Sequence, residues 1–159
     1  MKLPQPGSGP PRILELRLAA AHASARVGRQ MARHFARLDG LDEDEVDHLA
    51  LVASELLSNA VDHGGGGAAM EVKDADARMS LTLELGRDYW RLEVNDQGGG
   101  DPNELSKFLA PHALEAALED ERGRGFFLMR QMVDEMSVTR SKDGRGLCVT
   151  VLRRHGLAE

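Results

Sequence analysis

One helix-like stretch of the sequence combines an apolar, core-like pattern with side chains that can do chemistry. It is ELLSNAVDHG, residues 55–64, which closes a longer apolar segment. Glu55 and Asn59 are four residues apart and therefore share one face of a helix. Asp62 or His63 continues that row one turn later. An acid and an amide at the boundary of an apolar stripe either reach solvent or line a cavity, and this helix alone does not decide between the two.

Two glycine-containing stretches carry further groups suited to ligand binding. DQGGG (96–100) follows a predicted strand, so it places an acid and flexible backbone at the strand's end, where ligands often lie. ERGRG (121–125) places Gly123 and Gly125 just ahead of a predicted helix. Backbone amides at a helix N-terminus, with the helix dipole behind them, form an anion site. Each stretch is weak evidence by itself, but three such elements in this order favour one common ligand site.

Hydrophobic periodicity predicts the elements that must position these groups. Alternating apolar residues indicate strands, and a 3.6-residue period indicates helices. The predicted elements are a strand at 13–20, helices at 21–38 and 42–63, strands at 79–85 and 89–94, one or two short helices within 103–120, a helix at 126–136, and strands at 137–141 and 147–154. This order predicts an α/β (α+β) two-layer sandwich, with a mostly antiparallel mixed sheet and helices on one face.

Two segments fall outside this pattern. Residues 1–12 are rich in proline and glycine and are interpreted as a flexible tail, which leaves one domain at 13–155. Residues 65–77 have no clear period, and 70–74 is either a short strand or part of an irregular insertion.

The composition excludes several classes of protein. The chain has 159 residues, 42% of them hydrophobic and 29% charged, which is the balance of a globular protein. A net charge of −6 argues against nucleic acid as the main partner. No apolar run is long enough for a membrane span, and the N-terminus lacks the apolar region of a secretory signal. A single cysteine, Cys148, fits a reducing cytoplasm, so we expect a cytoplasmic protein without membrane contact.

The three stretches together resemble the N, G1 and G2 boxes of the GHKL (Bergerat-fold) ATPases, over about residues 13–154. Within that superfamily the sequence is most similar to the bacterial anti-sigma factor serine kinases. SELLSNAVDHG resembles their helix motif, in which a glutamate precedes the asparagine by four residues. GRGFFLMRQMVDEMSV resembles their G2 stretch. The resemblance implies the Bergerat ATP-binding fold, with ATP and Mg²⁺ as ligands.

This resemblance also implies roles for individual residues. Asn59 would hold Mg²⁺ through its carboxamide oxygen, a hard ligand for a hard cation. Glu55 would be the general base that takes the proton from an attacking hydroxyl. Asp96 would accept a hydrogen bond from the adenine amino group. The remaining expected nucleotide contacts are Asp62, His63, Gly98, Gly100, Gly123, Gly125, one of Arg122 and Arg124, and Cys148 with Thr150 on the last strand.

The sequence departs from the family pattern at two of these positions. DQGGGDP is one residue shorter than the usual glycine loop, so Gly98 fits the pattern better than Gly100. The last strand usually has a threonine near the adenine-binding aspartate. Counting from Gly146 points instead to Cys148, whose thiol is a poor donor, with Thr150 on the same strand face.

At the level of function, the resemblance implies a serine kinase that phosphorylates an anti-anti-sigma (STAS-type) protein and also binds a sigma factor, as a homodimer. The alternative is a nucleotide-dependent binding or switch module with negligible kinase activity. The Glu55–Asn59 pair favours the kinase, because a pure binder needs the asparagine but not the base. Between the glycine boxes, we expect residues 101–122 to form a lid over the phosphates.

Overall fold

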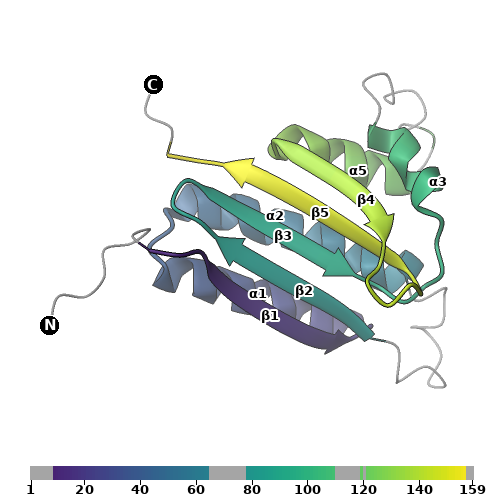
Figure 1. The fold of residues 1–159 in the computed structure, drawn as a ribbon, viewed down its shortest axis with the longest axis horizontal. Coiled ribbons are helices and arrows are strands. Elements are labelled where there is room, and N and C mark those ends of the chain that lie inside the picture. The colour runs from purple at the N-terminus through teal and green to yellow at the C-terminus, as the bar shows by residue number, and fades with distance from the viewer. Residues whose placement is uncertain (1–8, 65–77, 110–118, 120, 157–159) are drawn as a thin grey trace, which may run out of the picture.

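The computed structural model describes residues 9–64, 78–109, 119 and 121–156, and in these ranges the chain forms a sheet covered by helices (Figure 1). The strands are β1 (Arg12–Ala19), β2 (Arg78–Leu85), β3 (Tyr89–Asn95), β4 (Glu135–Arg140) and β5 (Leu147–Arg154). The helices are α1 (His22–Leu38), α2 (Glu43–Asn59), α3 (Pro102–Ser106) and α5 (Glu121–Met132), with a π-helical turn η1 (Ala60–Gly64) and a 3-10 turn η4 (Lys107–Leu109). Residues 1–8 of the predicted tail, the segment 65–77, and residues 110–118 and 120 of the predicted lid lie outside the described residues.

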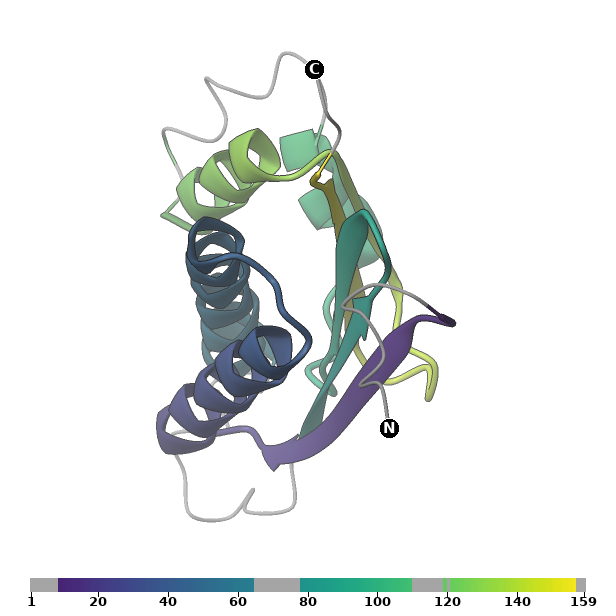
Figure 2. The ribbon, with the colours of Figure 1, turned by 90° about the vertical axis from the view of Figure 1, so that its left-hand side faces the viewer.

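The sheet has the order β1-β2-β3-β5-β4, and all four of its strand pairs are antiparallel. Figure 2 shows α1, α2 and α5 in one layer on one face of this sheet. The two-layer fold with helices on one face is therefore confirmed, and its described strands form an antiparallel rather than a mixed sheet. Within the described ranges, the opposite face of the sheet carries no helix layer.

Alternation within each strand divides its residues between these two faces. On β2, the buried side chains are every second residue, and β3 follows the same rule. These residues pack against the buried side of α2, so the core fills the space between sheet and helices. The largest fully buried core side chains include Trp90, Phe126, Leu49, Leu83 and Met129.

The last predicted helix begins and ends earlier than its pattern indicated. The periodicity predicted 126–136, whereas α5 spans Glu121–Met132 and β4 already begins at Glu135. The chain leaves the helix at Met132 because the N–H of Asp134 donates to the carbonyl of Leu152 on β5, at 2.8 Å. A sheet hydrogen bond thus replaces the last helical turn.

Candidate nucleotide site

Helix α2 positions Glu55 and Asn59 where the sequence placed them. The Asp42 side chain caps its N-terminus by accepting from the N–H of Glu45 at 3.0 Å, and three acidic residues follow in the first turn. A buried apolar stripe then fixes the helix against the sheet. Glu55 and Asn59 are half-buried beside this stripe, one turn apart, near the C-terminal end of α2.

The amide of the Asn59 side chain lacks a hydrogen-bond partner in the part of the chain that the structure describes. Its Nδ2 atom is buried and has no hydrogen-bond partner among the described residues. Buried polar atoms are almost always paired in native proteins, and an orphaned one at a candidate site calls for an explanation. A phosphate oxygen would accept from Nδ2 while Oδ1 faces a cation. The carboxamide therefore fits a metal–phosphate ligand.

Beyond Asn59 the helix widens into the π-helical turn η1, where the expected row of site residues breaks up. Single π-turns in helices are frequent at functional sites. Within η1, Asp62 Oδ1 lies 2.9 Å from Nε2 of His22 at the start of α1, and both side chains are about half exposed. In the structure Asp62 thus contacts α1. The side chain of His63 lies outside the described residues.

Asp96 is held rigidly at the end of β3. It is 8% exposed, and its Oδ1 atom accepts from the N–H groups of Gly98 and Leu147, at 3.0 and 3.1 Å. Gly146 packs directly against it, because a Cβ at this position would lie 2.2 Å from the carbonyl oxygen of Asp96. Sequence reasoning missed Gly146 and Leu147 as partners of Asp96. No local pattern in the sequence indicates this contact.

The glycine loop after Asp96 uses its three glycines differently. Gly98 supplies the N–H that holds the carboxylate. Gly99 has a φ of +71°, a conformation that other residues rarely adopt. Gly100 packs on β5, where an added Cβ would meet Leu147 Cδ1 at 2.9 Å, and its carbonyl accepts from Arg140 at 2.8 Å. Gly100 therefore anchors the loop to the sheet.

The structure does not support Cys148 and Thr150 as partners of Asp96. Strand alternation places Asp96 on the helix-covered face with Leu147, whereas Cys148 and Thr150 lie on the open face. There, Cys148 Sγ is 3.7 Å from Thr150 Oγ1, and burial raises the pKa of the thiol above its ordinary value. In the structure these two side chains therefore lie on the sheet face away from Asp96, and Leu147 is the β5 residue that donates to it.

The expectation for Gly123 and Gly125 also needs correction. Both lie inside the first turns of α5 rather than in a loop ahead of it. Gly125 faces α2, because a Cβ on it would lie 3.4 Å from Glu55 Oε2. Because Gly125 has no side chain, α5 can pack close to α2 at the carboxylate of Glu55. Arg124 is exposed and the side chain of Arg122 is not described, so the choice between these arginines stays open.

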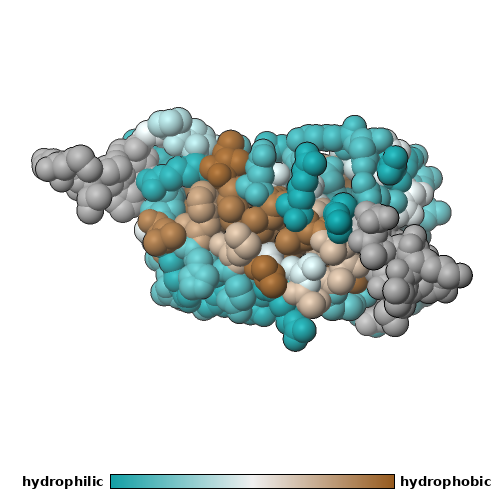
Figure 3. Space-filling model, turned by 90° about the horizontal axis from the view of Figure 1, so that it is seen from below, coloured by the Kyte–Doolittle hydropathy of each residue, from teal (hydrophilic) through white to brown (hydrophobic). Residues whose placement is uncertain are grey.

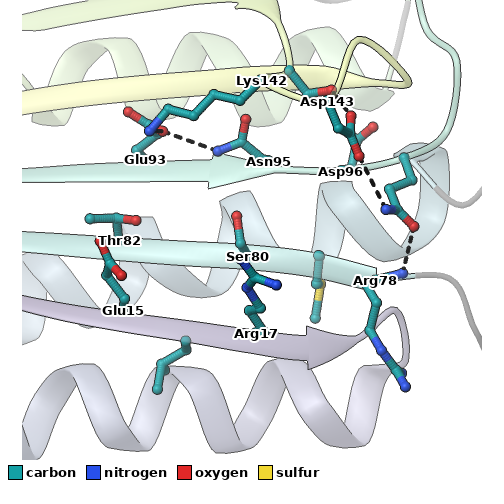
Figure 4. A pocket seen from close by; sticks show the side chains of 14 residues that line it. Glu15, Arg17, Arg78, Ser80, Thr82, Glu93, Asn95, Asp96, Lys142 and Asp143 are labelled. Carbon is teal, nitrogen blue, oxygen red and sulfur yellow. Dashed lines mark hydrogen bonds and ion pairs between the residues drawn. The ribbon is translucent and has the colours of Figure 1, made fainter.

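A separate groove of about 400 Å³ lies on the open face of the sheet (Figure 4). Its walls are polar side chains of β1, β2 and β3 and the β4–β5 turn, including Ser80, Glu93 and Lys142. Of the predicted site residues that the structure describes, only Asp96 lines it. This groove is thus on the opposite side of the sheet from Glu55 and Asn59.

Two further searches of the described residues are negative. No group of three or more His, Cys, Asp or Glu side chains is arranged to hold a metal ion. None of the helices in the described ranges is both long and apolar enough to cross a membrane. The candidate site described above comprises Glu55 and Asn59 on α2, the loop that follows Asp96 and the start of α5.

Fold and motifs identify the family. The model of the histidine kinase-like ATPase domain matches residues 18–152. The chain belongs to this family, as the resemblance of its three motifs predicted.

Several curated relatives carry one name, serine-protein kinase RsbW. The protein from Bacillus licheniformis is 28% identical over 102 residues, which cover 62% of this chain and 60% of that protein. The protein from Bacillus pumilus is 25% identical over 129 residues, covering 79% and 77%. The protein from Halalkalibacterium halodurans is 24% identical over 131 residues, covering 80% and 76%.

A solved structure shares the fold. It is the crystal structure of the RsbU and RsbW domains of a Mycobacterium tuberculosis protein, with a TM-score of 0.61 and 19% sequence identity. The match covers 90% of this chain but 32% of that one. The chain thus spans about a third of the mycobacterial protein, and 60% of the Bacillus licheniformis relative.

Proposed function

We propose that this chain binds ATP with Mg²⁺ and transfers the γ-phosphoryl group to a serine of a partner protein. The observation that carries the proposal is the convergence of Glu55, the orphaned Asn59 amide and Gly125 where α2 and α5 meet. Membership in the ATPase family supports nucleotide binding, and the name shared by the curated relatives supports serine transfer.

In this proposal, Glu55 and Asn59 divide the chemistry between them. Asn59 would hold Mg²⁺ through Oδ1, and this cation would supply positive charge beside the phosphates. Glu55 accepts the proton from the attacking serine hydroxyl. The serine oxygen forms a bond to the γ-phosphorus while the bond to the β-phosphate oxygen breaks, and ADP leaves. Glu55 lies one helical turn before Asn59 on α2, so its carboxylate would be near the cation held by Asn59.

Asn59→Ala tests the metal step. We expect the variant to lose most of the Mg²⁺-dependent part of ATP affinity, roughly tenfold or more, because one charge-assisted contact is worth about 1.5–3 kcal/mol. Calorimetry with ATP, with and without Mg²⁺, measures this difference. An unchanged Mg²⁺ dependence in the variant would remove Asn59 from the site.

Asp96 would read the adenine base. Its Oδ1 is engaged by two backbone N–H groups, which leaves Oδ2 as the acceptor for the adenine amino group. In Asp96→Asn, the side-chain NH₂ group should therefore replace Oδ2 and face the adenine amino group, so that two donors meet. We expect ATP affinity to fall about 10- to 100-fold, the effect of an unsatisfied buried group. Calorimetry of ATP against a triphosphate whose base lacks the amino group measures the discrimination, and equal losses for both would place Asp96 elsewhere.

The partners we propose are a STAS-type anti-anti-sigma protein as substrate and a sigma factor as the protein held between phosphorylation events. The name of the curated relatives supports the serine substrate class. Incubation with ATP, Mg²⁺ and the STAS proteins of the same genome, followed by intact mass measurement, tests it. One added phosphate on a STAS serine is the expected result. ATP binding without transfer to any of them would favour the alternative of a nucleotide-dependent switch module.

A further inference from the structure

The turn between β4 and β5, residues 141–146, lies beside the loop that follows Asp96. Ser141 is only 5% exposed, although it is a polar residue at the start of a turn. Its main-chain N–H donates to the carbonyl of Gly146 at 2.8 Å, and its Oγ atom accepts from the N–H of Gly146 at 2.9 Å. Ser141 thus fixes the position of Gly146, the glycine whose backbone packs against Asp96.

The carboxylate of Asp143 accepts hydrogen bonds from this turn and from the loop at the same time. Its Oδ1 atom accepts from the hydroxyl of Ser141 at 2.7 Å and from the N–H of Arg145 at 2.9 Å. Its Oδ2 atom accepts from the side-chain amide of Gln97, the residue directly after Asp96, at 3.1 Å. The backbone hydrogen bond from Arg145 contributes most to holding the pKa of Asp143 below its ordinary value, and the two side-chain donors add to it. The carboxylate is therefore charged at neutral pH.

The amide of Gln97 connects this carboxylate to the first residue of β2. Its Nε2 atom donates to Asp143, and its Oε1 atom accepts from the main-chain N–H of Arg78 at 3.0 Å. Because the nitrogen of the amide can only donate and its oxygen can only accept, the two bonds together fix which way the group points. Dashed lines in Figure 4 mark these bonds close to Asp96. The main chain that leaves Asp96 is thus held by side-chain hydrogen bonds.

Asp96 and Asp143 connect the same two segments of the chain. Asp96 Oδ1 accepts from one N–H of the loop and from the first N–H of β5. Asp143 accepts from Gln97 in that loop and from Arg145 in the turn that leads into β5. The two N–H groups that orient the carboxylate of Asp96 therefore belong to segments that Asp143 holds in place.

We propose that Asp143 is a positioning residue for adenine recognition. Through Gln97 and the β4–β5 turn, its carboxylate fixes the two N–H groups that orient Asp96, so that Oδ2 of Asp96 points toward the adenine amino group. A binding group keeps its productive geometry only when a supporting layer of hydrogen bonds holds it there. This inference rests on the proposed role of Asp96 in reading the base. It adds to the site a residue that lies outside the three sequence motifs.

Exchanging the polar groups of the bond between Gln97 and Asp143 tests the proposal. In Asp143→Asn, the two donors of the turn keep the amide oxygen on their side, so that the new NH₂ group faces the NH₂ group of Gln97. In Gln97→Glu, a carboxylate oxygen faces Oδ2 of Asp143 instead. Each single variant therefore breaks the bond. The double variant places a donor opposite an acceptor again and has the net charge of the wild type.

Each single variant should lose ATP affinity by roughly threefold to tenfold, the worth of one hydrogen bond. Its affinity for the triphosphate of a purine without the amino group should stay the same, because that base makes no contact through an amino group. The preference for ATP over this analogue should therefore fall in both single variants and return to the wild-type value in the double variant. Calorimetry with the two nucleotides measures it. A general loss of folding stability would weaken the binding of both nucleotides alike and leave the preference unchanged.

Asp134→Ala is the matched control, because the carboxylate of Asp134 also accepts a main-chain N–H, that of Arg154, but at the opposite end of β4. It should leave the preference for ATP unchanged. None of the substituted residues lies on α1 or β1, the side of the molecule where Figure 3 shows a hydrophobic patch. Contacts between copies of the chain through that patch should therefore not differ among the variants.

Two results would overturn the role of Asp143 alone: single variants that keep the wild-type preference for ATP, or a double variant that discriminates no better than the single ones. A wild type that binds both nucleotides equally would overturn the role of Asp96 in reading the base, and this inference with it. A wild type that binds neither nucleotide would overturn the proposed function itself. The preference and the two affinities thus separate failure of this inference from failure of the proposed function.

Discussion

Glu55→Gln should bind ATP nearly as the wild type does and lose most serine phosphorylation. General-base assistance is typically worth about 10²–10⁴-fold, and the substitution removes the proton acceptor while keeping the size of the side chain. The glutamine side chain still fits against Gly125, where the carboxylate of the wild type faces α5. The measurement is the rate of phosphate transfer to a STAS protein at saturating ATP, with the ATP dissociation constant measured in parallel.

Glu43→Gln provides the control for this substitution. Glu43 is on the same helix, is exposed, and makes its ion pair with Arg37, so the same chemical change occurs far from the site. It should leave both transfer and ATP affinity unchanged. If Glu55→Gln transfers at the wild-type rate, then Glu55 is not the base. A parallel loss of ATP affinity would instead assign Glu55 a binding role.

The position of the α2 row could be predicted because it depends on local periodicity. A capped, amphipathic segment of this length is stable as a helix when its apolar stripe packs against a sheet. The spacing of four residues then places Glu55 and Asn59 on the same face of that helix. The strands of the two hairpins were predictable for the same reason. Their alternation already indicated which side chains would be buried.

The errors arose where tertiary packing decides the outcome. Glycine is a poor helix former, so ERGRG was interpreted as a loop. In the structure the glycines lie in α5, where Gly125 allows close approach to Glu55 on α2. Cys148 was assigned by counting from Gly146, and an error of one residue on a strand moves a side chain to the opposite face. No local pattern signals that the backbone of Gly146 touches Asp96.

The π-turn after Asn59 could not be predicted from the sequence either. Its pairing of Asp62 with His22 joins segments about forty residues apart, which helical periodicity does not report. The same holds for a buried ion pair at the other end of the molecule. Glu45 on α2 is 9% exposed and accepts from both Arg153 and the indole of Trp90. Residues this far apart in the sequence become partners only in the folded chain.

Arg153→Ala should destabilise the fold by about 3 kcal/mol, the lower end of the range for removing one partner of a buried ion pair. The lower end applies because the Arg153 side chain is 25% exposed. Arg153 donates to both carboxylate oxygens of Glu45, at 2.9 Å, and to the carbonyl of Met132 at the end of α5, at 2.7 Å. Its loss leaves a buried carboxylate without its cation and frees the C-terminal end of α5. Chemical denaturation measures the change.

Arg154→Ala is the neighbouring control for this loss of stability. Arg154 pairs with Glu135 at the surface, where such pairs are worth about 0–1 kcal/mol. The control should therefore change the unfolding free energy by much less than Arg153→Ala does. If both variants lose the same unfolding free energy, the buried pair of Arg153 with Glu45 stabilises the fold no more than a surface pair does.

The effect of Arg153→Ala should also depend on pH. Burial alone would raise the pKa of Glu45, but hydrogen bonds from Arg153 and Trp90 outweigh it and hold that pKa below its ordinary value. A lowered pKa in the folded state contributes stability above the unfolded value of about 4.3, and this contribution is lost as the pH falls through the folded value. The difference in unfolding free energy between the wild type and Arg153→Ala should therefore be largest near neutral pH and shrink below about pH 4. A difference that stays constant down to about pH 3, beyond the unfolded value, would mean that Arg153 acts through packing and its bond to Met132 rather than through the charge of Glu45.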